Sequence, residues 1–103
     1  MKLIKKLSEM IEEEIEDAEK YARCALAHKE DNRELADVFF SLSGEELHHM
    51  EMLHEQVVRL IDAYRRENGA PPAAMQAVYD YLHQKHIDDV ADITVMRDKY
   101  RRQ

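Results

Sequence analysis

The spacing of the apolar residues constrains this chain more than any other feature. Within residues 4–25 they recur at steps of three and four, the period of an α-helix that buries one face, at Ile4, Leu7, Ile11, Ile15, Ala18, Ala22 and Ala25. Comparable steps run through residues 35–64 and 75–100, and no alternating strand pattern appears. The sequence therefore predicts an all-α fold with three helices, over about residues 2–29, 33–67 and 72–101.

Two breaks separate the predicted helices. At the first, Asp31 or Asn32 can turn the chain and cap the second helix, with Glu34 able to assist. At the second, residues 68–72 read Asn-Gly-Ala-Pro-Pro, and they hold one of only two glycines and both prolines of the chain. Asn and Gly tolerate the left-handed conformation that ends a helix, and Pro prevents its continuation. The first connection is short, so we expect the first two helices to be antiparallel neighbours.

The length and charge of the chain limit its class. Its 103 residues form one small domain, 1–103, that is short for a self-sufficient core, so a homodimer or a higher homo-oligomer is expected. A formal net charge of -7 argues against nucleic-acid binding, which depends on clustered cations. There is no apolar run long enough to span a membrane and no secretory signal. We therefore expect a cytoplasmic protein that binds neither nucleic acid nor membrane.

The second predicted helix carries polar side chains on its apolar stripe. Continuing from Leu42 by steps of four and three, the stripe passes through Glu46 and His49 before it reaches Leu53. Glu45 and His48 fall on a mostly polar face instead. We therefore predict that Glu46 and His49 point inward and that their neighbours point to solvent.

The first helix has a matching interruption at Glu14, which shares a stripe with Ile11 and Ala18. In an antiparallel pair folded back near residues 31–32, Glu14 lies level with His49 and within about one turn of Glu46. Unpaired buried carboxylates are strongly penalised, so two of them beside an imidazole favour a bound cation. Iron or manganese suits such ligands best, and zinc is an alternative. The competing interpretation is chance, because 22 acidic residues place some on any stripe.

These residues resemble those of the ferritin-like di-iron carboxylate proteins, particularly rubrerythrins and encapsulated ferritins. The resemblance covers roughly residues 10–57. "EEIEDAEKY" is similar to the family's metal-binding glutamate followed seven residues later by tyrosine, here Glu14 and Tyr21. "LADVFFSLSGEELHHM" is similar to the aromatic-rich approach to a Glu-x-x-His ligand pair, here Glu46 and His49.

The resemblance implies a four-helix bundle in which each di-iron site takes two glutamates and two Glu-x-x-His pairs. This chain has one of each, and its third helix lacks a second Glu-x-x-His. A homodimer would therefore complete the bundle and the site. The implied activity is oxidation of Fe(II) by oxygen or peroxide, with Glu14 as a bridging ligand, Glu46 as a bridging or chelating ligand and His49 as a terminal ligand.

Two further features follow from the resemblance. Tyr21 would hydrogen-bond a ligand or take part in electron transfer, or else it is a packed core residue. Rubrerythrins carry a four-cysteine centre that supplies electrons, whereas this chain has only Cys24, so redox turnover would need an external electron donor.

Some residues of the chain fall outside this pattern. The third helix offers His83 and His86 at His-x-x-His spacing, with Asp89 one turn further on, and whether any of them joins the site stays open. His54 is interpreted as a surface or rim residue. Gly44, in the middle of the second helix, either permits close helix approach or is merely tolerated, since mid-helix Gly costs about 1 kcal/mol relative to Ala.

Two other functions remain as alternatives. The first is a non-catalytic helical oligomerisation or interaction module, in which the same acids form structural ion pairs. The other is a zinc hydrolase, which ranks below the interaction module because no additional base or substrate-cradling loop is visible in the sequence.

Overall fold

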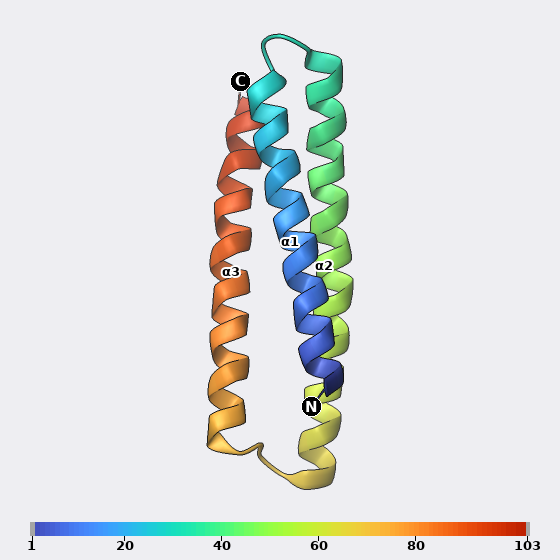
Figure 1. Cartoon of the computed structure of the whole chain (residues 1–103), viewed down its shortest axis with the longest axis vertical. Coiled ribbons are helices and arrows are strands. Elements are labelled where there is room, and N and C mark those ends of the chain that lie inside the picture. The colour runs from blue at the N-terminus through green and yellow to red at the C-terminus, as the bar shows by residue number, and fades with distance from the viewer. Residues whose placement is uncertain (1, 103) are drawn as a thin grey trace.

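A computed structural model describes residues 2–102 of the chain, and within that range it contains three long α-helices and no β-strand. They are α1 (Lys2–His28), α2 (Arg33–Asn68) and α3 (Ala73–Arg102). The helices lie roughly side by side in a rod that measures 55 × 18 × 17 Å (Figure 1). The all-α prediction is confirmed, and every helix boundary lies within about one residue of its predicted position.

The two connections use the residues that the sequence indicates. Asn32, rather than Asp31, caps α2, because its side-chain oxygen accepts a hydrogen bond from the Leu35 N–H at 3.2 Å. At the other end, Gly69 adopts φ 76° and its N–H donates to the Arg65 carbonyl at 2.9 Å. A positive φ is readily accessible only to glycine, so Gly69 can end α2 without strain.

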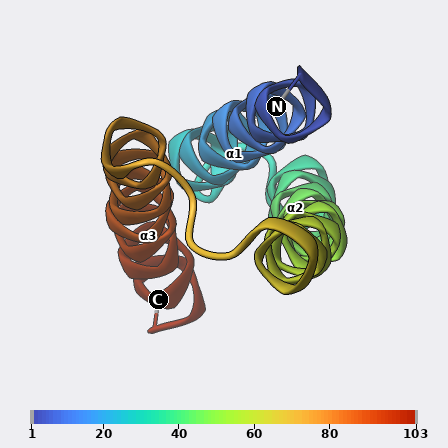
Figure 2. The same cartoon turned by 90° about the horizontal axis from the view of Figure 1, so that it is seen from below.

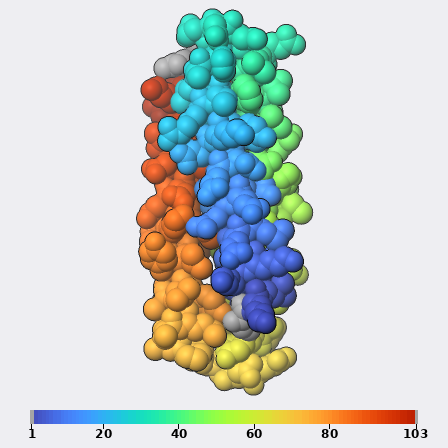
Figure 3. Space-filling view, viewed as in Figure 1, coloured from blue at the N-terminus to red at the C-terminus, as the bar shows by residue number. Residues whose placement is uncertain are grey.

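The core lies along the inner face of α1. Six of the seven predicted apolar positions of this helix are buried and Leu7 is half-buried, so the predicted stripe is confirmed. The small side chains of Ala18, Ala22 and Ala25 are almost fully buried, which lets the neighbouring helices approach closely. Seen from below, the helices form a triangle, and α3 makes most of its contacts with α1 (Figure 2). The space-filling view likewise shows α1 between the other two helices (Figure 3).

On α2 the predicted stripe is only partly right: Leu53 packs against the core, but the fully buried face lies about one residue further along the chain. The buried residues are Ala36, Ser43 and Met50, whereas Leu35 is 39% and Val38 50% exposed. The reason is that α2 is apolar on more than one face, and the face with the small residues Ala36 and Ser43 packs closest to its neighbours. The predicted stripe lies beside this face, at the half-buried border of the α1–α2 pair.

The C-terminal half of α3 is held to the connected ends of α1 and α2 by specific polar contacts. The Tyr100 hydroxyl donates to Asp37, and the Lys29 ammonium donates to the Tyr100 carbonyl. The Tyr100 ring also stacks on Phe40, with centroids 4.9 Å apart. Nearer the N-terminus of α3, the Lys85 ammonium donates to Glu12 of α1 at 2.8 Å. These contacts hold α3 against the other two helices, and its backbone packs mainly on α1 rather than on α2.

Candidate metal centre

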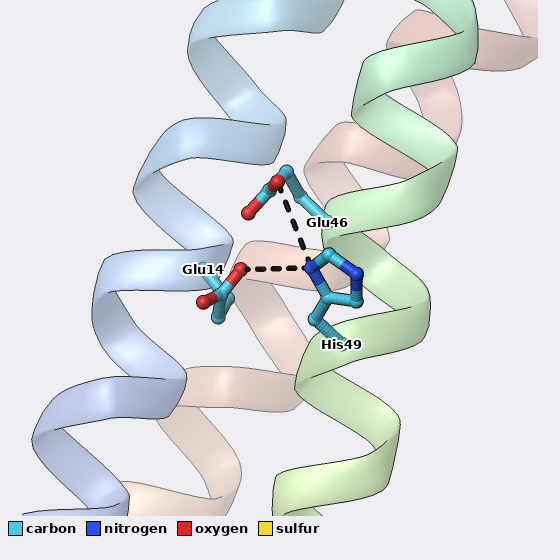
Figure 4. Close-up of side chains that lie close together, drawn as sticks. All are labelled: Glu14, Glu46 and His49. Atoms are coloured by element: carbon cyan, nitrogen blue, oxygen red, sulfur yellow. Dashed lines mark ion pairs between the residues drawn. The ribbon is translucent and has the colours of Figure 1, made fainter.

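Glu14, Glu46 and His49 come together on one side of the α1–α2 pair. Glu14 projects from α1, and Glu46 and His49 project from successive turns of α2, with α3 passing behind them (Figure 4). His49 Nδ1 lies 3.5 Å from Glu14 Oε2 and 3.7 Å from Glu46 Oε1. Each residue offers one donor atom, and these three atoms all lie within 4.8 Å of one another. In residues 2–102 no other group of three His, Cys, Asp or Glu side chains meets this condition.

The three side chains are less buried than the sequence predicts. The side chain of Glu46 is 18% exposed, that of Glu14 27%, and that of His49 51%. In a single chain the prediction that Glu46 and His49 point inward therefore holds only in part, because the core face of α2 is the adjacent one that carries Ser43 and Met50. Glu45 and His48 are exposed, as predicted.

The electrostatics of the site favour a positive charge between the two acids. A proton held between Glu46 and Glu14, together with burial and the negative charge of Glu14, raises the pKa of Glu46 to about 7. Oε2 of Glu14 is buried and accepts no hydrogen bond within the described chain. A buried carboxylate oxygen without a partner is costly, and a cation bound by both acids would satisfy it. The donor set, two carboxylates and an imidazole, fits iron, manganese or zinc.

Tyr21 does not join this group. Its half-buried ring stacks on Phe39, with centroids 6.2 Å apart, and no hydrogen bond to Glu14 is found within residues 2–102. Seven residues along α1 correspond to about 10 Å, so direct contact with the three ligand candidates would need a rearrangement. The structure favours the interpretation of Tyr21 as a packing residue.

The residues of α3 that the sequence left open also lie outside the group. Asp89 accepts a hydrogen bond from Lys85 at 3.2 Å, His86 is buried, and His83 contacts His54 of α2. The contact between His54 and His83 was missed, because it joins residues 29 positions apart on helices whose mutual tilt the sequence does not specify.

The contacts that Arg97 of α3 makes with α2 were also missed from the sequence. Its guanidinium donates to the Phe40 carbonyl at 2.6 Å and to the Ser43 hydroxyl, and it covers the Phe40 ring. The signal that could have found it is Gly44, since a mid-helix glycine beside a buried serine indicates that another group approaches the backbone.

Comparison with protein-family models, with curated protein sequences and with solved structures gives no match. In residues 2–102 no helix combines the length and the apolar character needed to cross a membrane.

Proposed function

We propose that the chain is a metal-binding protein of ferritin-like type, in which two copies complete a di-iron site that oxidises Fe(II). The observation that supports this best is the convergence of Glu14, Glu46 and His49, within which the buried Glu14 Oε2 accepts no hydrogen bond from the described residues. These three residues are also the ones that resemble the family's ligands.

The geometry of a single chain supports a half-site. Two carboxylates and one imidazole are half of the ligands that a pair of metal ions takes in the four-helix carboxylate proteins. The group opens on the side of the α1–α2 pair that α3 does not cover, and His49 is half-exposed there. A second copy related by a twofold axis would bring the same three residues to the opposite side of the metal pair.

The border around the group is apolar enough to serve as a dimer seam. The same face of α2 carries Leu35, Phe39, Leu42 and Leu53, of which Leu35 is exposed and the others half-buried. On α1, Met10 is 38% exposed and lies one turn before Glu14. Covering these side chains would bury apolar surface, which stabilises association by about 25 cal/mol per Å² before the costs of binding.

The proposed reaction consumes two Fe(II) ions. Oxidation by O2 gives two Fe(III) ions and, with two protons, one molecule of hydrogen peroxide. With hydrogen peroxide as oxidant, two protons are again consumed, and the products are two Fe(III) ions and two water molecules. The two acids hold the metal and release their shared proton when it binds. Repeated turnover requires an external electron donor, because this chain has a single cysteine and so no four-cysteine centre of its own.

The test is an anaerobic titration with Fe(II) followed by exposure to oxygen. We expect about two iron ions per dimer and the near-ultraviolet absorption of Fe(III). Glu46→Ala and His49→Ala should lose both signals. The neighbouring exposed residues supply matched controls, so Glu45→Ala and His48→Ala should behave as the unmodified chain. An unchanged titration in Glu46→Ala would refute the proposal.

A second candidate function is a non-catalytic helical interaction module. The pairing of His49 with both Glu14 and Glu46, at 3.5 and 3.7 Å, favours it, because these contacts could act as structural ion pairs. This alternative predicts the same melting temperature with Fe(II), with Mn(II) and with EDTA. A ligand that binds only the folded state must raise stability, so a higher melting temperature with metal would decide against the module.

A further inference from the structure

Three histidines face the space between α2 and the N-terminal half of α3. His54 lies on α2, and His83 and His86 lie one turn apart on α3. They line both a hollow of about 240 Å³ among the three helices and an apolar groove of about 370 Å³ between α2 and α3. The three imidazoles are therefore gathered where these two helices make little direct contact.

His54 and His83 already hold two nitrogens at a ligand-like spacing. Nε2 of His54 and Nδ1 of His83 are 3.3 Å apart, and the two rings stack with centroids at 5.2 Å. Two nitrogens bound to one tetrahedral Zn(II) at about 2.0–2.1 Å are separated by about 3.3–3.4 Å. The same distance fits a hydrogen bond between the two rings, so both rings would have to turn for their nitrogens to point at one ion.

His86 supplies the observation that points to a ligand. The residue is only 6% exposed, and its Nε2 is buried with no hydrogen-bond partner in the described chain. A buried imidazole nitrogen without a partner is costly, and it requires either a hydrogen bond or a metal to satisfy it. His86 lines the same hollow as His54 and His83, but the three residues do not bring one nitrogen each within 4.8 Å of one another, so one cation would satisfy all three only after the His86 side chain turns toward the pair.

The protonation state of these residues suits metal binding. Burial lowers the pKa of His54 and of His86, and the neighbouring His83 lowers that of His54 further. A metal binds the neutral imidazole, so histidines that resist protonation keep their ligand form at neutral pH. The charged groups that face His86 are Glu12 and Asp89, whose carboxylates are paired with Lys85, and Lys85 itself.

We propose that His54, His83 and His86 form a second metal site. It binds one divalent ion of intermediate softness, such as Zn(II), and thereby holds α3 against α2. A water molecule or Glu51, which lines the same groove, completes the coordination. Imidazole ligands favour Zn(II), Cu(II) and Ni(II), whereas the carboxylates of the first site favour harder ions. The chain would thus hold different metals on two faces.

The second site is independent of the proposed di-iron function. His54 follows His49 by five residues, which places it about 7.5 Å further along α2 and about 140° around the helix. It faces α3, whereas Glu14, Glu46 and His49 lie on the side of the pair that α3 does not cover. The two groups have no residue in common.

The experiment uses the full chain carrying Glu46→Ala and His49→Ala, so that the first site cannot contribute. Co(II) reports tetrahedral coordination through its visible absorption, and Zn(II) affinity is measured by displacing it. We expect about one ion per chain and a higher melting temperature with Zn(II) than with EDTA. His83→Ala, His54→Ala and His86→Phe, made one at a time, should each weaken Zn(II) binding at least about tenfold.

The controls separate a built site from loose binding to surface histidines. His28→Ala and His48→Ala should leave the Zn(II) affinity unchanged, because neither residue lines the hollow or the groove. His83 is exposed, so its replacement should not disturb folding, and the circular dichroism of every variant without metal checks this. Unchanged affinity in any of the three test variants, or an equal loss in His48→Ala, would overturn the three-histidine site. Neither result would bear on the iron titration of the unmodified ligands Glu46 and His49.

Discussion

Gly44 of α2 lies directly beneath the guanidinium of Arg97 from α3. A Cβ at position 44 would be 3.0 Å from Nη2 and 3.3 Å from Nη1 of Arg97. The guanidinium is not free to withdraw, since it donates to the Phe40 carbonyl and to the Ser43 hydroxyl. Gly44 therefore permits the close approach of α3, which was one of the two interpretations of this residue.

This contact makes the effect of Gly44→Ala depend on Arg97. Alanine gains about 1 kcal/mol of helix propensity over glycine, but displacing a charged hydrogen-bond donor costs about 1.5–3 kcal/mol. We expect Gly44→Ala to lower the free energy of unfolding by about 1 kcal/mol in the native chain and to raise it by up to about 1 kcal/mol in an Arg97→Ala background. Urea unfolding of the four proteins gives this double-mutant cycle. Equal effects in both backgrounds would show that the two residues are not coupled.

The stability of the metal-free protein should depend on the protonation of Glu46. Its pKa is raised from an ordinary value of 4.5 to about 7, so the folded state binds the proton more tightly than the unfolded state. This contribution to stability is fully present below the unfolded pKa and is lost as the pH rises through the folded value. We expect the melting temperature in EDTA to fall across this window, and Glu46→Gln to reduce that fall. The titration belongs to the Glu14–Glu46 pair, so Glu45→Gln is the matched control.

The metal affinity of the site should change with pH in the opposite direction to the stability of the metal-free protein. Binding displaces the proton that the two acids share, so the affinity of the proposed site for Fe(II) or Mn(II) should increase as the pH rises toward 7. Mn(II) titrations at several pH values measure it without oxidation. An affinity that is independent of pH would contradict the role of Glu46 as a ligand.

The proposed dimer can be tested away from the ligands. Leu35 is exposed on the α2 face that carries Glu46, but it lies eleven residues, or about 16 Å, from it. Leu35→Lys should therefore shift the solution mass toward that of a monomer. It should also reduce the iron bound per chain to less than half of that in the unmodified protein. The control is Val95→Lys, which alters a 64% exposed side chain of α3 and should change neither quantity. A Leu35→Lys protein that keeps both the dimer mass and full iron binding would place the seam elsewhere.

Tyr21 provides a test of the packing interpretation. Because the Tyr21 ring stacks on Phe39 and its hydroxyl makes no hydrogen bond to Glu14 in residues 2–102, Tyr21→Phe keeps the observed contacts. We expect the rate of Fe(II) oxidation, followed by stopped-flow absorption, to stay within about twofold of the unmodified chain. A much larger decrease, with unchanged iron binding, would restore the role in electron transfer that the family resemblance implies.

The predicted apolar stripe was reliable on α1 and misleading on α2. On α1 one face alone is strongly apolar, so the period of three and four residues identifies the buried side chains. On α2 two neighbouring faces are apolar, and a single sequence does not say which one contacts the core. The structure selects the face of Ala36 and Ser43, and Glu46 and His49 consequently lie at the border of the helix pair.

The sequence by itself determined the three helices, their ends and the common height of Glu14, Glu46 and His49, because helix periodicity, capping residues and the rise per residue are local properties. Only the tertiary structure decided how deeply these side chains are buried, that Gly44 makes room for Arg97, and that His54 meets His83. Those outcomes depend on the rotation and tilt of each helix against its neighbours, which the packing of side chains far apart in the chain sets collectively.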